Sequence, residues 1–350
     1  MTSIRLRLTP HDVQRIRLAV SPLSEIALSF YMLRSGEVPP VHRPWVTSTL
    51  RQLQHVDVEA LSALLPVQGE VADFMFVGIR DANTTLEMQL KALAQVPRDR
   101  LLLDMEKAWH ASTCPYGTAS GGAEVPRLAR DLVTTTEGLE RMTRALQDYW
   151  VLCLGPAWDR VRSTLEADVA HRGSNLLRAG LDGLLADLHP RLRLHQDWLH
   201  IEPSLFDAEV NLRGEGLVLI PSAFAGSYLW WHPSECGPVY IAYQARGAAN
   251  LWQPNREATQ GAGSLAALMG RGRASVLVAV DLPLSTTDLS RQLGQSLGAV
   301  SAHLGILRAG GLVHSWRSGR RVLYARTALG HRMVEANCDA DSELDDHAPG

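Results

Sequence analysis

Helix-start and helix-stop signals near the C-terminus constrain the fold more than any other feature of the sequence. Ser285 is a typical N-cap residue, and Asp288, three residues later, can complete a capping box. Gly294 is suited to end that helix, and Ser296 to cap a second one, which a glycine pair beginning at Gly310 would stop. We therefore expect two short helices joined by a tight turn.

The apolar residues of the same stretch follow the helical period. After Ser296, the residues Val300, Leu304 and Leu307 fall at positions i, i+4 and i+7, so that one side of the helix is apolar. Residues 273–282 (RASVLVAVDL) also carry apolar side chains at helical spacing and predict a preceding helix. Helix, short turn, helix is an arrangement with which many proteins read DNA.

The second helix of this pair has unusually short side chains near its N-terminus, where a surface helix commonly carries Glu and Lys. These residues would let the helix backbone approach a DNA groove closely. They are Gly298, Ala299, Ser301, Ala302 and His303.

A basic hairpin is predicted directly after this helix. Residues 313–316 and 322–325 are the expected strands, joined by a turn at Ser318-Gly319. The arginines at its tip are suited to phosphates or a minor groove, although hairpin tips are also charged for solubility alone. They are Arg317, Arg320 and Arg321.

The distribution of charge agrees with a nucleic-acid partner, whereas the total does not. The chain has a formal charge of −3, with 34 basic and 37 acidic residues. Residues 264–336 hold nine arginines and three acids, and the last 14 residues hold five acids and no Lys or Arg. A basic block of this kind is typical of a phosphate-binding module, the alternative being an ordinary solvated surface.

Residues 264–336 resemble the winged helix of ArsR-type bacterial repressors, above all in STTDLSRQLGQSLGAVSAHLGILRAGGLVHSWRSGRRVLYART. The segments SPLSE, LEADV and LLADLHPR of the preceding chain resemble the N-terminal domain of unknown function in actinobacterial regulators that end in this winged helix. The resemblance implies a homodimeric repressor that binds a palindromic operator in double-stranded DNA and is released by an effector.

The same resemblance implies roles for individual residues. The positions that read the groove would be Ser296, Gly298, Ala299, Ser301, Ala302 and His303. The wing that clamps the DNA backbone would hold Arg317, Arg320 and Arg321, and we expect a further phosphate contact from Arg308.

The resemblance fails at the positions where metal-sensing members of the family carry their ligands. The helix TTDLSRQL has no cysteine, and Thr327, Ala328 and Gly330 stand where Asp or His ligands would be expected. His331 and Glu335, one helical turn apart, could seat a metal together with Cys338, but solvated side chains at a helix end are the favoured interpretation. We therefore expect neither a metal nor a cofactor.

The fold class expected for the whole chain is α+β. Residues 1–255 predict a mixed domain for dimerisation and possible effector binding, with helix starts at Ser21-Pro22, Val46, Asp57 and Thr84 and a small antiparallel sheet within 191–244. Long helical patterns cover 123–150 and 156–188, with breaks near Gly155-Pro156 and Gly173. Residues 256–263 are the expected linker, 264–336 the winged helix-turn-helix domain, and 337–350 an acidic, disordered tail.

No catalytic motif is visible, and we expect no enzymatic activity. The stretch 117–124 (GTASGGAE) resembles a flexible loop more than a phosphate cradle, and the carboxylate pairs Asp104/Glu106 and Glu166/Asp168 would point to different helix faces. His195, His200 and His232 could converge, although ordinary surface or core histidines are favoured. The alternative hypothesis makes the first domain an enzyme or protein-binding module that the winged helix localises to DNA.

Aromatic residues crowd the strand-rich segment. They suit a pocket for an apolar or planar effector, a dimer interface or an ordinary sheet core, and the sheet core is the favoured interpretation. The effector-binding candidates are Trp198, Trp230, Trp231 and Tyr240.

The remaining features indicate the compartment. Cys114, Cys153, Cys236 and Cys338 show no metal-ligand spacing and predict reduced thiols. Neither a signal peptide nor an apolar run long enough for a membrane span is apparent, so the sequence predicts a cytoplasmic protein.

Overall fold

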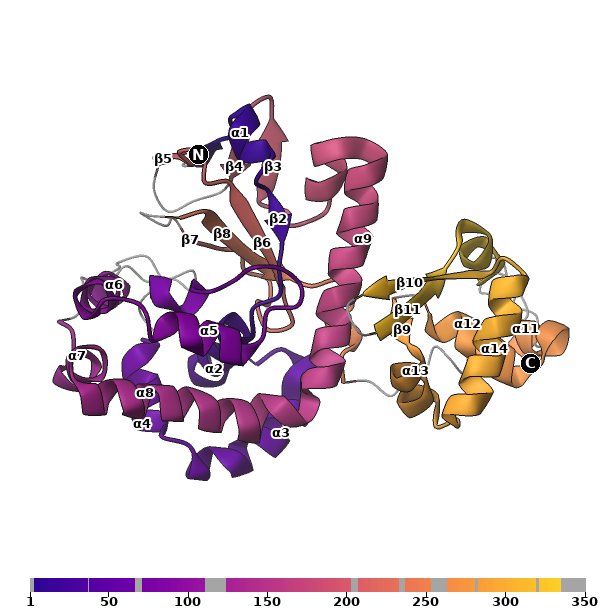
Figure 1. Ribbon diagram of the computed structural model, residues 1–350, viewed down its shortest axis with the longest axis horizontal. Helices are drawn as coiled ribbons and strands as arrows, with labels where there is room; N and C mark the ends of the chain where they lie inside the picture. The colour runs from indigo at the N-terminus through magenta and orange to yellow at the C-terminus, as the bar shows by residue number, and fades with distance from the viewer. Residues whose placement is uncertain are drawn as a thin grey trace, which may run out of the picture. The chain divides into compact units, whose positions relative to one another are not determined.

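The computed structural model describes residues 3–36, 38–66, 71–110, 124–202, 207–232, 237–252, 263–280, 283–318 and 321–334. The chain divides into two compact units, residues 1–248 and residues 249–350 (Figure 1). Helices and sheets occur in both units, so the predicted α+β class is confirmed. Most of the expected linker, Arg320 and the acidic tail lie outside the described residues.

Two four-stranded sheets form the β-structure of the large unit. The first has the order β3-β4-β1-β5, with β3 Leu192–His195, β4 Trp198–Ile201, β1 Ile4–Arg7 and β5 Ala208–Asn211. The second has the order β2-β6-β8-β7, with β2 Arg17–Leu18, β6 Leu217–Ser222, β8 Val239–Gln244 and β7 Trp230–His232.

The prediction of a single antiparallel sheet within 191–244 is wrong. The pairs β1–β5, β2–β6 and β6–β8 are parallel, while β3–β4, β1–β4 and β7–β8 are antiparallel. The N-terminal strands β1 and β2 also join sheets built about 200 residues later in the chain. Alternation of apolar residues shows which face of a strand is buried, but it does not determine the partner or its direction.

The inner faces of the two sheets share one apolar core. Ile4, Leu6 and Leu199 of the first sheet belong to the same buried cluster as Leu219 and Ile241 of the second. The helices of this unit are α1 Pro10–Val13, α2 Pro22–Ser35, α3 Arg43–Gln52, α4 Val58–Leu64, α5 Leu86–Leu93, α6 Arg98–His110, α7 Arg127–Thr134, α8 Thr136–Tyr149 and α9 Trp158–Leu185.

Local capping fixes several of these helix starts. Ser21 caps α2 by accepting a hydrogen bond from the Ser24 backbone N–H, and Asp57 caps α4 in the same way. Helix α5 starts one residue later than predicted, with Thr85 and not Thr84 as its cap. The Thr84 hydroxyl instead accepts hydrogen bonds from the backbone N–H groups of Arg80 and Asp81. Helix α3, by contrast, begins earlier than predicted, at Arg43 and not at Val46.

Helix α9 differs from the prediction in the position of its break. The helix continues through Gly173, where a single glycine costs only about 1 kcal/mol relative to Ala. The backbone departs from helical geometry instead at Ala179 and Gly180, where Gly180 has φ +61°. The break expected near Gly155-Pro156 is confirmed, since a π turn at Trp150–Leu154 and a 3-10 turn at Gly155–Ala157 separate α8 from α9.

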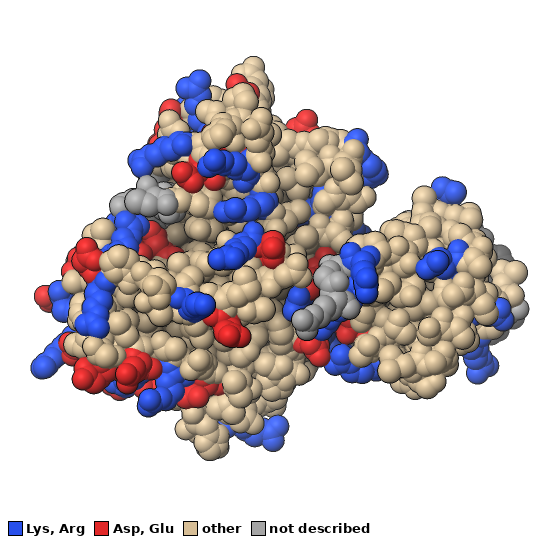
Figure 2. Space-filling view, in the orientation of Figure 1, with Lys and Arg blue, Asp and Glu red and all other residues tan. Residues whose placement is uncertain are grey.

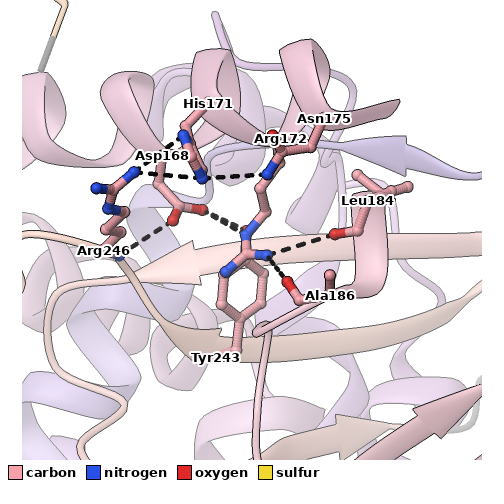
Figure 3. Close-up of polar contacts among 8 residues, drawn as sticks. All are labelled: Asp168, His171, Arg172, Asn175, Leu184, Ala186, Tyr243 and Arg246. Carbon is pink, nitrogen blue, oxygen red and sulfur yellow. Dashed lines mark hydrogen bonds and ion pairs between the residues drawn. The ribbon is translucent and has the colours of Figure 1, made fainter. Parts of the chain in front are cut away.

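A buried polar network joins α9 to the end of β8 (Figure 3). Arg172 Nε donates to Asp168 Oδ2 at 3.1 Å, and Arg172 Nη1 donates to the Leu184 and Ala186 carbonyls at 3.4 and 3.3 Å beyond the break. Tyr243 Oη donates to the same Asp168 oxygen at 2.6 Å, while the Arg172 guanidinium lies 4.7 Å from the Tyr243 ring centroid. This network ties the broken C-terminal end of α9 to the second sheet.

The C-terminal unit contains four helices and a small sheet among the elements with defined bounds. In chain order they are α11 Gly263–Met269, α12 Arg271–Ala279, β9 Leu284–Ser285, α13 Thr286–Leu293, α14 Leu297–Ala309, β10 Val313–Ser318 and β11 Arg321–Arg326. Residues 328–334 are helical as well. The antiparallel sheet has the order β10-β11-β9, and the helices pack around a core that includes Val276, Val300, Leu304 and Leu307.

Candidate DNA-binding site

The predicted caps place α13 and α14. Ser285 and Asp288 form the capping box of α13, with the Asp288 N–H donating to Ser285 Oγ at 3.3 Å. Gly294 ends α13 in the left-handed conformation, with φ +63°. Ser296 Oγ then accepts from the Ala299 N–H at 3.2 Å and starts α14. The helix-turn-helix geometry therefore rests on short-range side-chain-to-backbone bonds.

Helix α14 turns one face to the core and another to solvent. Val300, Leu304 and Leu307 are buried, as their spacing predicts. Ser296, Gly298, Ser301 and Ala302 are exposed, and Ala299 is half-buried. The structure thus brings five of the six predicted groove-reading positions to the start of α14 with at least partial access to solvent.

Gly305 extends this face and was missed in the sequence. It is exposed, and a Cβ atom built on either Gly298 or Gly305 would meet no atom within 4 Å. The spacing i, i+3, i+4 and i+7 places four small residues on one helix face, namely Gly298, Ser301, Ala302 and Gly305. This spacing could have identified Gly305 from the sequence. A strip of small residues therefore runs along the exposed side of α14, which we call the α14 strip.

His303, the sixth predicted position, lies elsewhere. Its ring is half-buried against α12, so that a Cβ atom on Gly272 would fall 2.5 Å from His303 Nε2. The glycine at 272 makes room for this imidazole. The structure therefore places His303 against α12 and off the α14 strip.

Arg308 connects α14 to the wing. Its side chain is exposed, and its Nη1 donates to Ser315 Oγ of β10 at 3.2 Å. The guanidinium is thereby held at the end of α14 next to the hairpin, a position from which it can reach a phosphate.

The wing is the hairpin of β10 and β11, and its described arginines have different surroundings. Arg317 is exposed opposite Val322. Arg321 is half-buried, and its Nη1 lies 3.9 Å from Asp288 Oδ2, so the capping-box acid partly compensates its charge. Arg291 Nη2 lies 3.5 Å from the other Asp288 oxygen. Arg317 is thus the better placed of the two for an external phosphate.

An aromatic pair on β10 was also missed. The rings of His314 and Trp316 stack with centroids 5.1 Å apart and planes at 20°. The alternation H-x-W within a predicted strand places both side chains on one face of the wing and could have indicated the pair.

Figure 2 shows the charges around this site. The unit labelled α11 to α14 in Figure 1 displays Lys and Arg side chains with very few acids in this view. This agrees with the excess of arginine in residues 264–336.

The four effector candidates do not share a site. Trp198 lies on β4 of the first sheet, whereas Trp230, Trp231 and Tyr240 belong to the second. Trp230 is buried with its ring edge-on to Tyr31 at 5.2 Å, Trp231 packs against the core, and Tyr240 stacks on Phe76 at 5.4 Å. An open pocket of about 350 Å³ is lined by other residues, namely Met32, Gly36, Val38, Pro39, Phe224, Gly226, Ser227 and Tyr228.

The three histidines do not converge either. His195 and His200 lie on the first sheet, while His232 ends β7 of the second sheet and hydrogen-bonds Asp73. Arg100 bridges Asp73 and Asp104, with N–O distances of 3.2 and 2.9 Å. Burial, together with the Asp73 charge, raises the Asp104 pKa to about 6.

The paired carboxylates have separate partners, as predicted. Asp104 is buried beside Arg100, whereas Glu106 lies 3.6 Å from Arg130. Asp168 belongs to the buried network, and Glu166 pairs with Arg162 at 2.6 Å. Neither pair presents two carboxylates to one point.

The described residues contain no group of three His, Cys, Asp or Glu side chains that could hold a metal ion. Glu335 and Cys338, which the sequence associated with His331, lie outside them, as do Cys114 and Cys236. Cys153 is free and buried, and burial raises the pKa of its thiol to about 12. Within the described part of the chain, no helix has the length and hydrophobicity needed to cross a membrane.

Comparison with known proteins agrees with this geometry. Residues 281–315, which include α13 and α14, match the family model for the bacterial regulatory protein, arsR family. No curated protein matches the chain. Among solved structures, reduced HlyU from Vibrio cholerae N16961 is similar at 29% sequence identity, covering 23% of this chain and 87% of HlyU, with a TM-score of 0.19. The family match shows that residues 281–315 of the C-terminal unit form an ArsR-family helix-turn-helix, a DNA-binding module of bacterial transcription regulators.

Proposed function

We propose that the protein is a homodimeric repressor that binds a palindromic operator and is released by a small-molecule effector. The observation that supports this best is the α14 strip, because exposed small residues on the second helix of the motif permit close approach to a major groove. The ArsR-family match over the same residues agrees with the proposal.

In this proposal, most of the affinity for DNA comes from the close fit of α14 in the groove and from arginine contacts with phosphates. The Ser301 hydroxyl can bond a base edge, and the Ala302 methyl can contact a thymine methyl group. Arg308, at the C-terminal end of α14, and Arg317, on the wing, are both exposed and would bind phosphates. Arg321 would contribute less, because Asp288 shares its charge.

Two copies of the winged helix would read two half-sites about 34 Å apart, one turn of the duplex. Residues 1–255 would provide the dimer contacts and the effector site, and we propose no catalytic activity for them. An effector would release DNA only if it bound one of two conformations more tightly than the other.

The test is a fluorescence-anisotropy titration of the full chain with a duplex from its own upstream promoter region. Ser301→Glu places a carboxylate in the α14 strip, and we expect at least about 100-fold weaker binding, because unfavourable charge contacts cost several kcal/mol. Ser174→Glu, at an exposed position on α9, is the matched control and should bind like the wild type. Equal affinity of all three proteins would refute the assignment.

One observation favours the alternative, an enzyme localised by the winged helix. The cluster of Asp73, Asp104, Arg100 and His232 combines burial, an ion pair and a raised carboxyl pKa, which is common at catalytic sites. Incubation with a metabolite extract, followed by mass spectrometry, would test this. Turnover by the wild type that Asp104→Asn abolishes would establish the alternative, and no turnover by the wild type would count against it.

A further inference from the structure

The outward face of the first sheet in the large unit carries a basic and aromatic surface. Each strand alternates strictly: in β1, Ile4 and Leu6 are buried in the core, while Arg5 and Arg7 are exposed. The register aligns the outward residues in two rows across four strands. One row is Arg193, His200, Arg5 and Glu209, and the other is His195, Trp198, Arg7 and Asn211.

Trp198 is the centre of this face. The guanidinium carbons of Arg5 and Arg7 each lie 5.8 Å from the centroid of its ring, so that two cations flank one aromatic side chain. Trp198 is only half-buried and is not a member of the core cluster between the two sheets. Trp198 therefore belongs to the outward face of the sheet and not to the core.

The charge of the face is positive. Glu209 pairs with Arg5 at 3.4 Å, and both side chains are about half exposed. Glu202, just after β4, lies 3.6 Å from His200 Nδ1. Among the described residues, no acid forms an ion pair with Arg7 or Arg193. Arg193 Nη1 donates to the Leu192 carbonyl at 3.1 Å, so the remaining N–H groups of Arg193 and those of Arg7 can bind an anion from outside the chain.

We propose that this face binds single-stranded nucleic acid. Arg5, Arg7 and Arg193 would contact phosphates, and bases would stack against Trp198 and the adjacent guanidinium planes, a combination typical of single-strand-binding surfaces. Figure 2 shows Lys and Arg side chains, together with a few acids, over the part of the large unit where Figure 1 draws the strands of the first sheet.

The shape and chemistry of the face favour this ligand over others. An open four-stranded surface suits an extended polymer, whereas small molecules are usually held in concave sites. An acidic protein segment would satisfy the arginines but would make no use of a tryptophan placed between two of them. The proposal concerns the large unit and is independent of operator binding by α14.

The experiment is an anisotropy titration of the full chain with a fluorescein-labelled single-stranded (dT)20 at several salt concentrations. Arg5→Gln/Arg7→Gln/Arg193→Gln should weaken binding about tenfold or more and reduce the salt slope by about 2, at about 0.7 for each lost contact to a single strand. Trp198→Ala should weaken binding roughly 5- to 100-fold through lost stacking.

Controls separate this surface from the winged helix. Arg51→Gln/Arg127→Gln/Arg160→Gln removes the same charge from exposed helix positions elsewhere in the large unit and should bind (dT)20 like the wild type. Ser301→Glu should lose the promoter duplex and keep (dT)20. Circular dichroism and denaturant unfolding of each variant would confirm that it is folded.

Several outcomes would overturn the proposal. The first is no binding of (dT)20 by the wild type, and the second is an equal loss of (dT)20 affinity in the control triple variant. The third is a loss of (dT)20 affinity in Ser301→Glu while the sheet variants bind like the wild type. The fourth is displacement of labelled (dT)20 by poly-glutamate as effectively as by unlabelled (dT)20, with no effect of Trp198→Ala. The last result would identify an acidic protein segment as the ligand.

Discussion

The two units differ in what they bury. The core of the C-terminal unit is made of apolar side chains, and Ser285, the cap of α13, is the only buried polar residue among its described members. The large unit buries ionisable groups, which include Glu25, His42, Asp104, Asp168 and Arg172. Among the described residues, the C-terminal unit buries no ionisable side chain, whereas the stability of the large unit depends on buried polar contacts that protonation or mutation can change.

The largest effect is expected from the buried network of the large unit. Arg172→Met leaves Asp168, which is fully buried, without its ion-pair partner, and should destabilise the large unit by about 3–5 kcal/mol. Denaturant unfolding followed by tryptophan fluorescence would measure this. Adding Asp168→Asn to Arg172→Met should recover part of the loss, and a single mutant as stable as the wild type would contradict the importance of the network.

The C-terminal unit should respond to a cavity instead. Leu304→Ala removes a fully buried side chain of α14 and should destabilise this unit by about 3 kcal/mol, equally at pH 5 and pH 9. Promoter affinity should fall together with the fraction of folded winged helix. A strong dependence of the loss on pH would contradict the contrast between the two cores.

Glu25 makes the large unit less stable at high pH. Its Oε2 accepts the Ala223 N–H at 3.2 Å, no hydrogen bond reaches Oε1, and burial raises its pKa to about 8. The folded state therefore favours the protonated acid, and stability falls as the pH rises from about 4.5 to about 8. Glu25→Gln should remove this dependence on pH and raise the free energy of unfolding at pH 9 by about 3 kcal/mol. This figure is smaller than the full pKa shift at about 1.36 kcal/mol per unit, because the Gln amide is also buried.

His42 should act with the opposite sign. It is buried against Phe224, with ring centroids 5.0 Å apart, and desolvation lowers its pKa to about 4. The folded state favours the neutral ring. The contribution of His42 to the free energy of unfolding is therefore fully present above pH 6.5 and is lost as the pH falls towards 4. His42→Gln should therefore flatten the acid side of the stability profile by about 2 kcal/mol. An unchanged profile would show that the ring is hydrated.

The same contrast explains how much could be predicted from sequence. The caps at Ser21, Asp57, Ser285 and Ser296 are contacts between residues three apart, so the local pattern was sufficient. The C-terminal unit is built almost entirely from such signals and from apolar residues at helical spacing. Most of its fold and the greater part of the α14 strip could therefore be predicted.

Long-range contacts could not be predicted in this way. Glu25 bonds Ala223, 198 residues later, and the flanking of Trp198 by Arg5 and Arg7 depends on the pairing of β1 with β4. Likewise, the position of His303 depends on a gap at Gly272 in another helix. Periodicity identifies the buried side of an element, but only the assembled structure identifies the neighbour across it.

The most direct test of the central claim is hydroxyl-radical footprinting of the full chain on its upstream promoter region. A dimeric repressor that inserts α14 into successive major grooves predicts two protected half-sites related by inverted sequence, with centres about 10 base pairs apart or a multiple of that. Ser301→Glu should abolish both protected sites together. A single protected site, uniform protection without sequence preference, or an unchanged footprint in Ser301→Glu would contradict the account.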